Sequence, residues 1–215
     1  MKQDTKLFIE KYIQLIEENQ FEDLYALVRH EDIDCSDFTD ALYKAGIQPL
    51  DYMTYVPNRF AADIKHITEY NIPENITVIK PVAFRENDLH RVSFPKSLTL
   101  LSAGCFEFCK ELTLIDTKNV EYIEEYAFMG CSKLNTLITS ANVIDNFAFK
   151  DCMELENIHI SKNLNTIGYG AFNHVPATKI HYGGTKQDWS YVVLSHYWKE
   201  DTLRKIICID GEVLL

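Results

Sequence analysis

The chain has 215 residues, of which 47% are hydrophobic and 25% charged, a composition typical of a folded protein rather than a disordered one. Its formal net charge is −11, and residues 1–75 hold 15 Asp and Glu against 7 Lys and Arg. Because an acidic chain repels phosphate backbones, we expect no nucleic-acid partner. No apolar run approaches the roughly 18 residues of a membrane span, so we expect no membrane partner either.

Residues 1–70 are predicted to form an acidic helical domain. Apolar residues recur at helical spacing between Leu7 and Ile16, and again between Leu24 and Val28. Ser36 has the character of an N-cap for a third helix, which Gly46 ends. This domain is predicted either to cap the end of the array described next or to act as a docking or dimerisation domain.

Five phenylalanines follow at almost equal intervals of 22, 22, 21 and 23 residues. They are Phe84, Phe106, Phe128, Phe149 and Phe172. A fixed period in this range is typical of a solenoid, in which each coil is too short to bury its own apolar face and packs against its neighbours. We therefore expect the five rings to form one continuous buried column.

Other apolar positions repeat with the same period. An aliphatic residue stands five positions before each phenylalanine, as in Ile123 and Ile144. Downstream, segments such as Leu155 to Ile160 alternate in the way of a strand. We predict one short parallel strand per coil, with the segment through the phenylalanine forming a turn or a short helical piece on the opposite side.

The repeat resembles that of the BspA-like leucine-rich repeats of bacterial and protist proteins. The third copy matches the pattern of that family at seven positions: Val120, Ile123, Ala127, Phe128, Cys131, Leu134 and Leu137. The segment Ile180 to Trp189 is similar to one that often closes such arrays. The resemblance implies an interaction role without catalytic residues, and the short length suggests a non-secreted bacterial or phage-type member.

The C-terminal region, residues 183–215, is predicted to cap the array. Thr185 and Asp188 have the spacing of a capping box, which predicts a short helix through Trp189. Ile206 to Leu214 is predicted to form a hairpin around Asp210 and Gly211. The predicted fold is thus an α+β solenoid: a BspA-like leucine-rich repeat array of about five 21–23-residue coils at residues 71–182, with an N-terminal helical domain and a C-terminal helix and hairpin cap.

Six cysteines raise the question of a metal site or disulfides. Cys109, Cys131 and Cys152 occupy one repeat position, and Cys105 takes the small-residue position before Phe106. Burial of small thiols explains all four without oxidation. Because no second cysteine pair has matching spacing and the histidines are scattered, we predict no metal, no cofactor and no catalytic residues, and hence that the protein is not an enzyme.

Function is predicted to reside on outward positions of the strands, which alternate with the buried ones. The predicted partner-binding residues are Arg91, Ser93, Leu114, Asp116, Thr136, Ile138, Asn157, His159, Lys179 and His181. His159 and His181 fall at equivalent positions of adjacent repeats and could form a metal or catalytic pair. Because nothing else converges there, the interpretation favoured is two solvated residues on a binding face.

The leading functional hypothesis is a non-catalytic protein–protein interaction module, encoded by a bacterium or phage and directed at a host protein. The N-terminal segment mixes acids into what would be the apolar part of an export signal, so a cytoplasmic location is expected. The alternatives are a surface adhesin-like module that binds glycans or matrix proteins, and a structural or homo-oligomeric subunit. The identity of the protein partner lies beyond the sequence.

Overall fold

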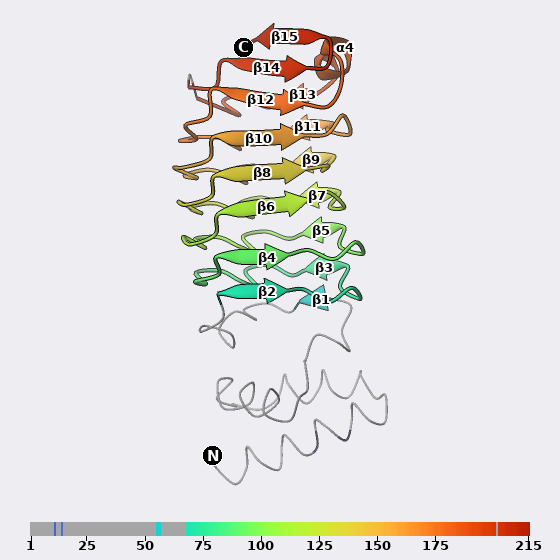
Figure 1. The fold of residues 1–215 in the computed structure, drawn as a ribbon, viewed down its shortest axis with the longest axis vertical. Coiled ribbons are helices and arrows are strands. Elements are labelled where there is room, and N and C mark those ends of the chain that lie inside the picture. The colour runs from blue at the N-terminus through green and yellow to red at the C-terminus, as the bar shows by residue number, and fades with distance from the viewer. Residues whose placement is uncertain (1–10, 12–13, 15–54, 57–67, 201) are drawn as a thin grey trace.

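The computed structural model describes residues 11, 14, 55–56, 68–200 and 202–215, so the helices predicted between Leu7 and Gly46 lie outside the described residues except at Lys11 and Gln14. The described chain winds into a solenoid of about six turns stacked along one axis (Figure 1). The solenoid class is confirmed. The expected number of coils, about five, is corrected to about six, because β-strands already pair at residues 55–56 and 69–71, before the first phenylalanine of the column.

One side of the solenoid carries the longer strands. A six-stranded sheet runs in the order β15-β14-β12-β10-β8-β6. Its strands are β6 (Leu114–Thr117), β8 (Thr136–Thr139), β10 (Asn157–Ile160), β12 (Lys179–Tyr182), β14 (Lys205–Cys208) and β15 (Gly211–Leu214). All neighbours are parallel except β14 and β15, which form an antiparallel hairpin. A separate pair, β2 (Glu69–Asn71) and β4 (Arg91–Ser93), continues this side toward the N-terminus.

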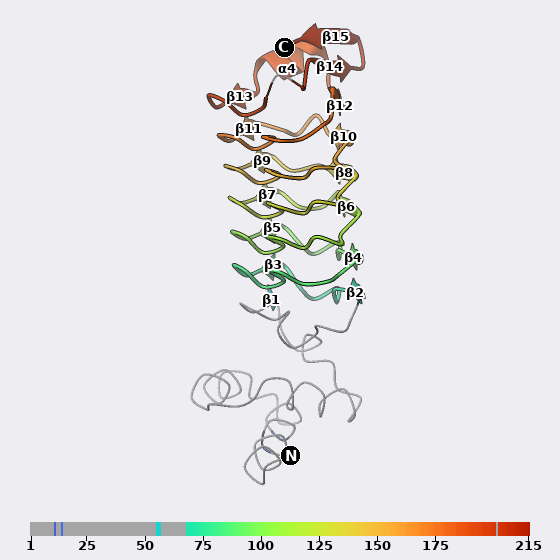
Figure 2. The ribbon, with the colours of Figure 1, turned by 90° about the vertical axis from the view of Figure 1, so that its left-hand side faces the viewer.

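A second sheet lies on another side of each coil, as Figure 2 shows in profile. Its seven parallel two-residue strands are β1 (Tyr55–Val56), β3 (Val78–Ile79), β5 (Leu100–Leu101), β7 (Tyr122–Ile123), β9 (Val143–Ile144), β11 (Thr166–Ile167) and β13 (Val193–Leu194). The prediction of one strand per coil was therefore wrong. The strands from β3 to β11 each contain the aliphatic residue that stands five positions before a phenylalanine. The sequence did not reveal them as strands because two residues are too few to display an alternating pattern.

The segment through each phenylalanine is a turn, as predicted, and it too is hydrogen-bonded to the next coil. In the second coil the N–H groups of Gly104, Phe106 and Phe108 donate to Glu125, Ala127 and Met129 of the third, at 2.7–3.0 Å. The residues two before and two after the phenylalanine have positive φ in all five coils, for example Tyr126 at 60° and Gly130 at 71°. This left-handed backbone aims three alternate N–H donors along the solenoid axis, which adds a third set of hydrogen bonds between coils to those of the two sheets.

The predicted phenylalanine column is confirmed. Successive rings from Phe84 to Phe172 lie 4.8, 5.3, 5.3 and 5.5 Å apart between centroids, and their planes differ by no more than 7°. All five side chains are buried. Each fully buried phenylalanine stabilises the fold by roughly 1.5–3 kcal/mol relative to exposure. The column is therefore the main apolar axis of the array.

The repeated cysteines are buried thiols, as predicted, and each also makes a hydrogen bond between coils. The Sγ atoms of Cys109, Cys131 and Cys152 donate to the carbonyl oxygens of Phe84, Phe106 and Phe128, at 2.9, 3.2 and 3.3 Å. A small side chain with a weak donor fits this position, because it fills the space beside the ring and satisfies a carbonyl of the preceding turn. All five cysteines in the described residues are free.

We expect these thiols to resist alkylation in the folded protein. Burial raises the pKa of Cys109 to about 12 and raises the pKa of Cys131 and of Cys152 as well. Because only the thiolate reacts, iodoacetamide at mildly alkaline pH should leave the peptides containing these three cysteines unmodified. Peptide mass spectrometry should show full modification once urea is present. Rapid labelling of Cys131 in the folded chain would contradict its position in the core.

The C-terminal elements occur where they were predicted. Helix α4 (Lys186–Ser190) begins with a capping box, in which the Thr185 side chain accepts from the Asp188 N–H and Asp188 Oδ2 accepts from the Thr185 N–H at 2.8 Å. Trp189 is buried against the last coil. The hydrogen bonds from Thr185 lower the pKa of the exposed Asp188 carboxyl, which fits a carboxylate that accepts bonds in its ionised form.

Candidate protein-binding face

The outward side chains of the longer strands form two straight columns, which together we call the strand face. Parallel register places Leu114, Thr136 and Asn157 directly beside one another, and likewise Asp116, Ile138 and His159. Because these strands are hydrogen-bonded, the spacing along each column is set by the backbone, at about 4.8 Å per coil. The face is a preformed surface whose chemistry changes coil by coil.

All ten predicted partner-binding residues lie on this side. Exposed side chains are those of Arg91, Ser93, Leu114, Asn157, His159 and Lys179, and half-buried ones are Asp116, Thr136, Ile138 and His181. Leu114 is 42% exposed, whereas most leucines of the described residues are buried. The positions thus face solvent as expected, and a binding role for them remains a prediction.

The face is divided, which the sequence pattern did not indicate. Within the described strands, no hydrogen-bonded ladder joins β4 to β6. The break coincides with Phe94, whose ring packs edge-on against that of Phe106, with 5.7 Å between the ring centroids. The equivalent position in the next two coils holds a smaller residue, Thr117 and then Thr139. Arg91 and Ser93 therefore belong to a separate two-stranded sheet, and the other eight predicted residues share one continuous sheet.

The continuous sheet also extends further than predicted. Lys205 and Ile207 on β14 are register partners of Lys179 and His181 and continue both columns by one coil. The sequence predicts a hairpin for this segment, and the predicted partner-binding residues end at His181. Only the structure shows that Lys205, Ile206, Ile207 and Cys208 alternate between half-buried and buried, because three apolar residues in a row do not alternate in the sequence.

A shallow groove of about 520 Å³ crosses the C-terminal half of the strand face. Its lining includes Ile138, His159, His181, Ile207 and Ile209. Ile209 is 72% exposed at the rim. The groove therefore combines aliphatic side chains with two imidazoles on a rigid sheet.

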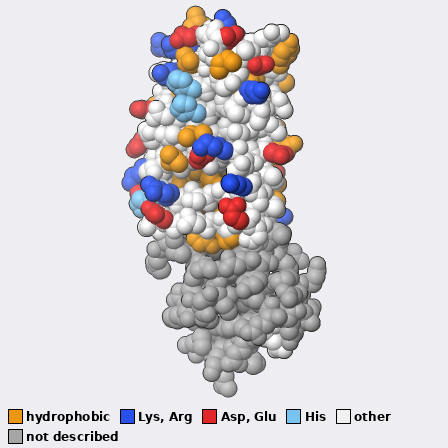
Figure 3. Space-filling view, turned by 45° about the vertical axis from the view of Figure 1, so that its right-hand side comes forward, with side chains coloured by type: hydrophobic (Ala, Val, Ile, Leu, Met, Phe, Trp, Pro, Cys, Tyr) orange, Lys and Arg blue, Asp and Glu red, His pale blue; other side chains and the backbone are white. Residues whose placement is uncertain are grey.

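The two histidines are in contact. Their rings stack with centroids 4.9 Å apart and planes 14° apart, so the expectation that adjacent strands would bring them together is confirmed. Burial lowers the pKa of His181, and the neighbouring His159 and Lys179 lower it further. Figure 3 shows a histidine patch in pale blue, with orange hydrophobic and blue basic side chains close to it.

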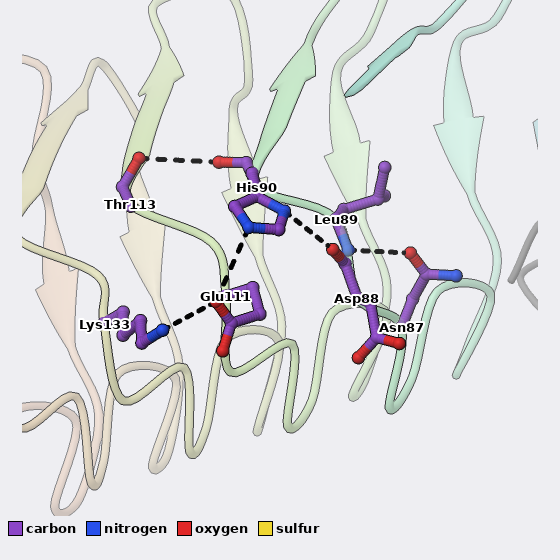
Figure 4. A network of polar contacts seen from close by, with 7 residues as sticks. All are labelled: Asn87, Asp88, Leu89, His90, Glu111, Thr113 and Lys133. Carbon is purple, nitrogen blue, oxygen red and sulfur yellow. Dashed lines mark hydrogen bonds and ion pairs between the residues drawn. The ribbon is translucent and has the colours of Figure 1, made fainter. Parts of the chain in front are cut away.

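Elsewhere, charged groups bond one coil to the next. Glu111 lies between His90 Nε2 at 3.6 Å and Lys133 Nζ at 2.7 Å, and the His90 carbonyl accepts from Thr113 (Figure 4). The hydrogen bond from Lys133 lowers the pKa of the Glu111 carboxyl. This network spans three coils next to the break between β4 and β6, so we assign it to coil stacking and not to chemistry.

A second histidine group has the same character. His174 Nδ1 contacts Asp151 Oδ1, and its Nε2 lies 3.2 Å from Glu200 Oε1, so both ring nitrogens face carboxylates of other coils. Across the described ranges, no group of three or more His, Cys, Asp or Glu side chains is arranged to hold a metal ion. In the same described ranges, no helix is long and apolar enough to cross a membrane.

The geometry defines a class of protein: a parallel β-solenoid of leucine-rich repeat type that presents a flat strand face. The family model for the BspA type leucine rich repeat region matches six copies over residues 54–179, more than half of the chain. The chain belongs to that family. No curated protein is significantly similar to it.

Two solved structures share the fold. A leucine-rich repeat protein from Bacteroides ovatus superposes with a TM-score of 0.59 at 16% identity, over 76% of this chain and 49% of that one. Another from Eubacterium ventriosum superposes with a TM-score of 0.50 at 21% identity, over 74% of this chain and 50% of that one. The chain spans about half the length of each, and at these identities the likeness concerns the fold.

Proposed function

We propose that the protein is a non-catalytic module that binds a protein partner through the strand face between β6 and β14. One observation carries the proposal: register aligns outward side chains of unlike chemistry, including the 42% exposed Leu114, on one continuous sheet. A rigid surface orders few groups on association, so little free energy is lost when a partner binds. Leucine-rich repeat proteins generally serve as interaction modules, which supports the same function.

The size and chemistry of the surface favour a macromolecule over a metabolite. Five strands, β6 to β14, span about 20 Å over four gaps. Small-molecule sites are concave and enclose most of their ligand, whereas this groove is shallow and open. A helix or a patch of a folded protein matches these dimensions.

The remaining parts of the proposal concern the two ends and the cellular role. We propose that α4 and the β14–β15 hairpin close the array, since β15 covers the edge of β14 and Trp198 packs edge-on against Phe172, 6.2 Å between ring centroids. For residues 1–70 the cap and docking hypotheses both stand as predictions, as do the boundaries at residues 70 and 182. A cytoplasmic bacterial or phage protein directed at a host factor is the role we propose for the whole chain.

Self-association is a second candidate with an observation of its own. β13 is the last strand of the seven-stranded sheet, and exposed apolar side chains surround it: Tyr191 at 72%, Val193 at 63% and Tyr197 at 71%. An open strand edge with apolar side chains can pair with another chain. Light scattering on the purified protein tests this candidate, and a monomeric mass at high concentration would contradict it.

The test of the main proposal is partner capture with strand-face variants. The tagged full chain should recover one stoichiometric protein from its own cell, and the double variant Leu114→Glu/Lys179→Glu should lose it. Because both side chains are exposed, the free energy of unfolding should change by less than about 0.5 kcal/mol. Tyr122→Glu, at a 47% exposed position of the other sheet, is the matched control and should bind normally. Normal capture by the folded double variant, or recovery of chaperones only, would refute the proposal.

A further inference from the structure

Four nitrogen-bearing side chains gather on the strand face where β10, β12 and β14 lie side by side. They are His159, Lys179, His181 and Lys205, which we call the cationic cluster. Lys179 and Lys205 are register partners, and so are the stacked His159 and His181. Like charges directly opposite on neighbouring strands destabilise a sheet. Lys179 and Lys205 therefore form a like-charged pair, and protonation of either histidine would add to the positive charge.

The carboxylates nearby leave most of the cluster uncompensated. Glu212 on β15 pairs with Lys205 at 3.1 and 3.2 Å, and on β6 Asp116 pairs with Lys118 at 2.6 Å. The outward residues of the neighbouring strand β8, Thr136 and Ile138, are uncharged. Among the described residues, no carboxylate forms an ion pair with Lys179, His159 or His181. These three groups are therefore available to an external anion.

The surroundings of the cluster indicate which kind of anion. Ile138 and Ile207 flank the two histidines along their column, and the 72% exposed Ile209 forms the rim of the groove. A phosphate backbone or a sulfated glycan would leave these aliphatic side chains without a contact. An acidic peptide segment that also carries an aliphatic side chain would use both the cations and the groove.

We propose that the cationic cluster binds an acidic segment of the protein partner, with an apolar side chain of that segment in the groove, and that binding strengthens as the pH falls below neutral. The proposal rests on the proposed function and names the partner chemistry of the same face. Charge-assisted hydrogen bonds from imidazolium and ammonium groups to carboxylates are the interactions expected.

The pH dependence follows from the state of His181. Its pKa is lowered, mainly by burial and then by His159 and Lys179, so the ring is neutral at pH 7. A histidine whose pKa is depressed by folding contributes stability above its unfolded pKa and loses it as the pH falls. A carboxylate placed beside the ring would stabilise its protonated form and so offset the unfavourable free energy of protonating His181 in the folded chain. Proton uptake and binding of an acidic segment are therefore linked, and each favours the other.

The test uses the full chain and two labelled short peptides, one of Asp and Glu with Leu at intervals and one with Asn and Gln in place of the acids. Fluorescence anisotropy at low ionic strength is compared at about pH 7.5 and about pH 5.5, on either side of the ordinary histidine pKa. We expect about tenfold tighter binding of the acidic peptide at the lower pH, equivalent to about 1.4 kcal/mol. The uncharged peptide should bind weakly at both.

Two variants and a control identify the groups responsible. His159→Gln/His181→Gln should abolish the pH response, and Lys179→Gln/Lys205→Gln should weaken binding at both pH values. His196→Gln, at an exposed position next to β13, should behave as the unmodified chain. An unchanged pH response in the double histidine variant would overturn the proposal, and so would tighter binding of heparin or a single-stranded oligonucleotide than of the acidic peptide. If the captured partner still binds the double histidine variant but not Leu114→Glu/Lys179→Glu, this inference fails while the proposed function stands.

Discussion

Replacing Phe128 with alanine is expected to lower the free energy of unfolding by about 3–5 kcal/mol. The ring is completely buried between Phe106 and Phe149, with stacking distances of 5.3 Å on both sides. Removing it leaves a cavity that the two neighbouring coils cannot fill, because both are held by three sets of hydrogen bonds between coils. Urea unfolding followed by circular dichroism measures the change.

The matched control is Tyr122→Ala in the same coil. Tyr122 is an aromatic residue of similar size, but it is 47% exposed on β7. Its truncation should change stability by less than about 1 kcal/mol, since little apolar area returns to water. Equal effects of the two truncations would show that the column does not have the special energetic role assigned to it.

Replacing Gly168 with alanine is expected to destabilise the fold by about 1–3 kcal/mol or more. A Cβ atom at this position would lie 2.5 Å from the backbone nitrogen of Asn146 and 2.6 Å from the carbonyl carbon of Asp145, both in the preceding coil. Backbone atoms cannot move aside as a flexible side chain can. The two coils would have to separate, which would also strain the hydrogen bond from Gly168 N–H to the Ile144 carbonyl at 2.7 Å. Thermal unfolding by calorimetry provides the measurement.

Gly183→Ala is the matched control for this prediction. Gly183 also packs against the preceding coil, yet the nearest atom to an added Cβ is the nitrogen of Lys162 at 3.4 Å, which is ordinary contact. The substitution should be neutral or slightly stabilising, because alanine restricts the unfolded chain more than glycine does. A loss of stability as large as that of Gly168→Ala would point to a general intolerance of alanine and not to the close approach of backbones.

Several features of the candidate site could be anticipated only in part. The equivalence of His159 and His181 follows from counting repeat positions, and the structure brings their rings together. The alignment of Lys205 with Lys179 could not be counted in the same way, because the interval from Ile180 to Ile206 is longer than the earlier intervals on this side of the solenoid. The cluster therefore depends on how the last coil returns to the sheet.

The sequence by itself determined the axis of this protein. Coils of nearly equal length must place equivalent residues one above another, so the spacing of Phe84 to Phe172 was enough to predict the ring column, the buried thiols and the solenoid. Only the tertiary structure decided how one coil meets the next: the second sheet of two-residue strands, the break at Phe94, the backbone contact at Gly168 and the neighbours of His181. The reason is that a repeat period specifies which residues face each other, whereas side-chain volume and backbone dihedral angles specify how closely they can approach.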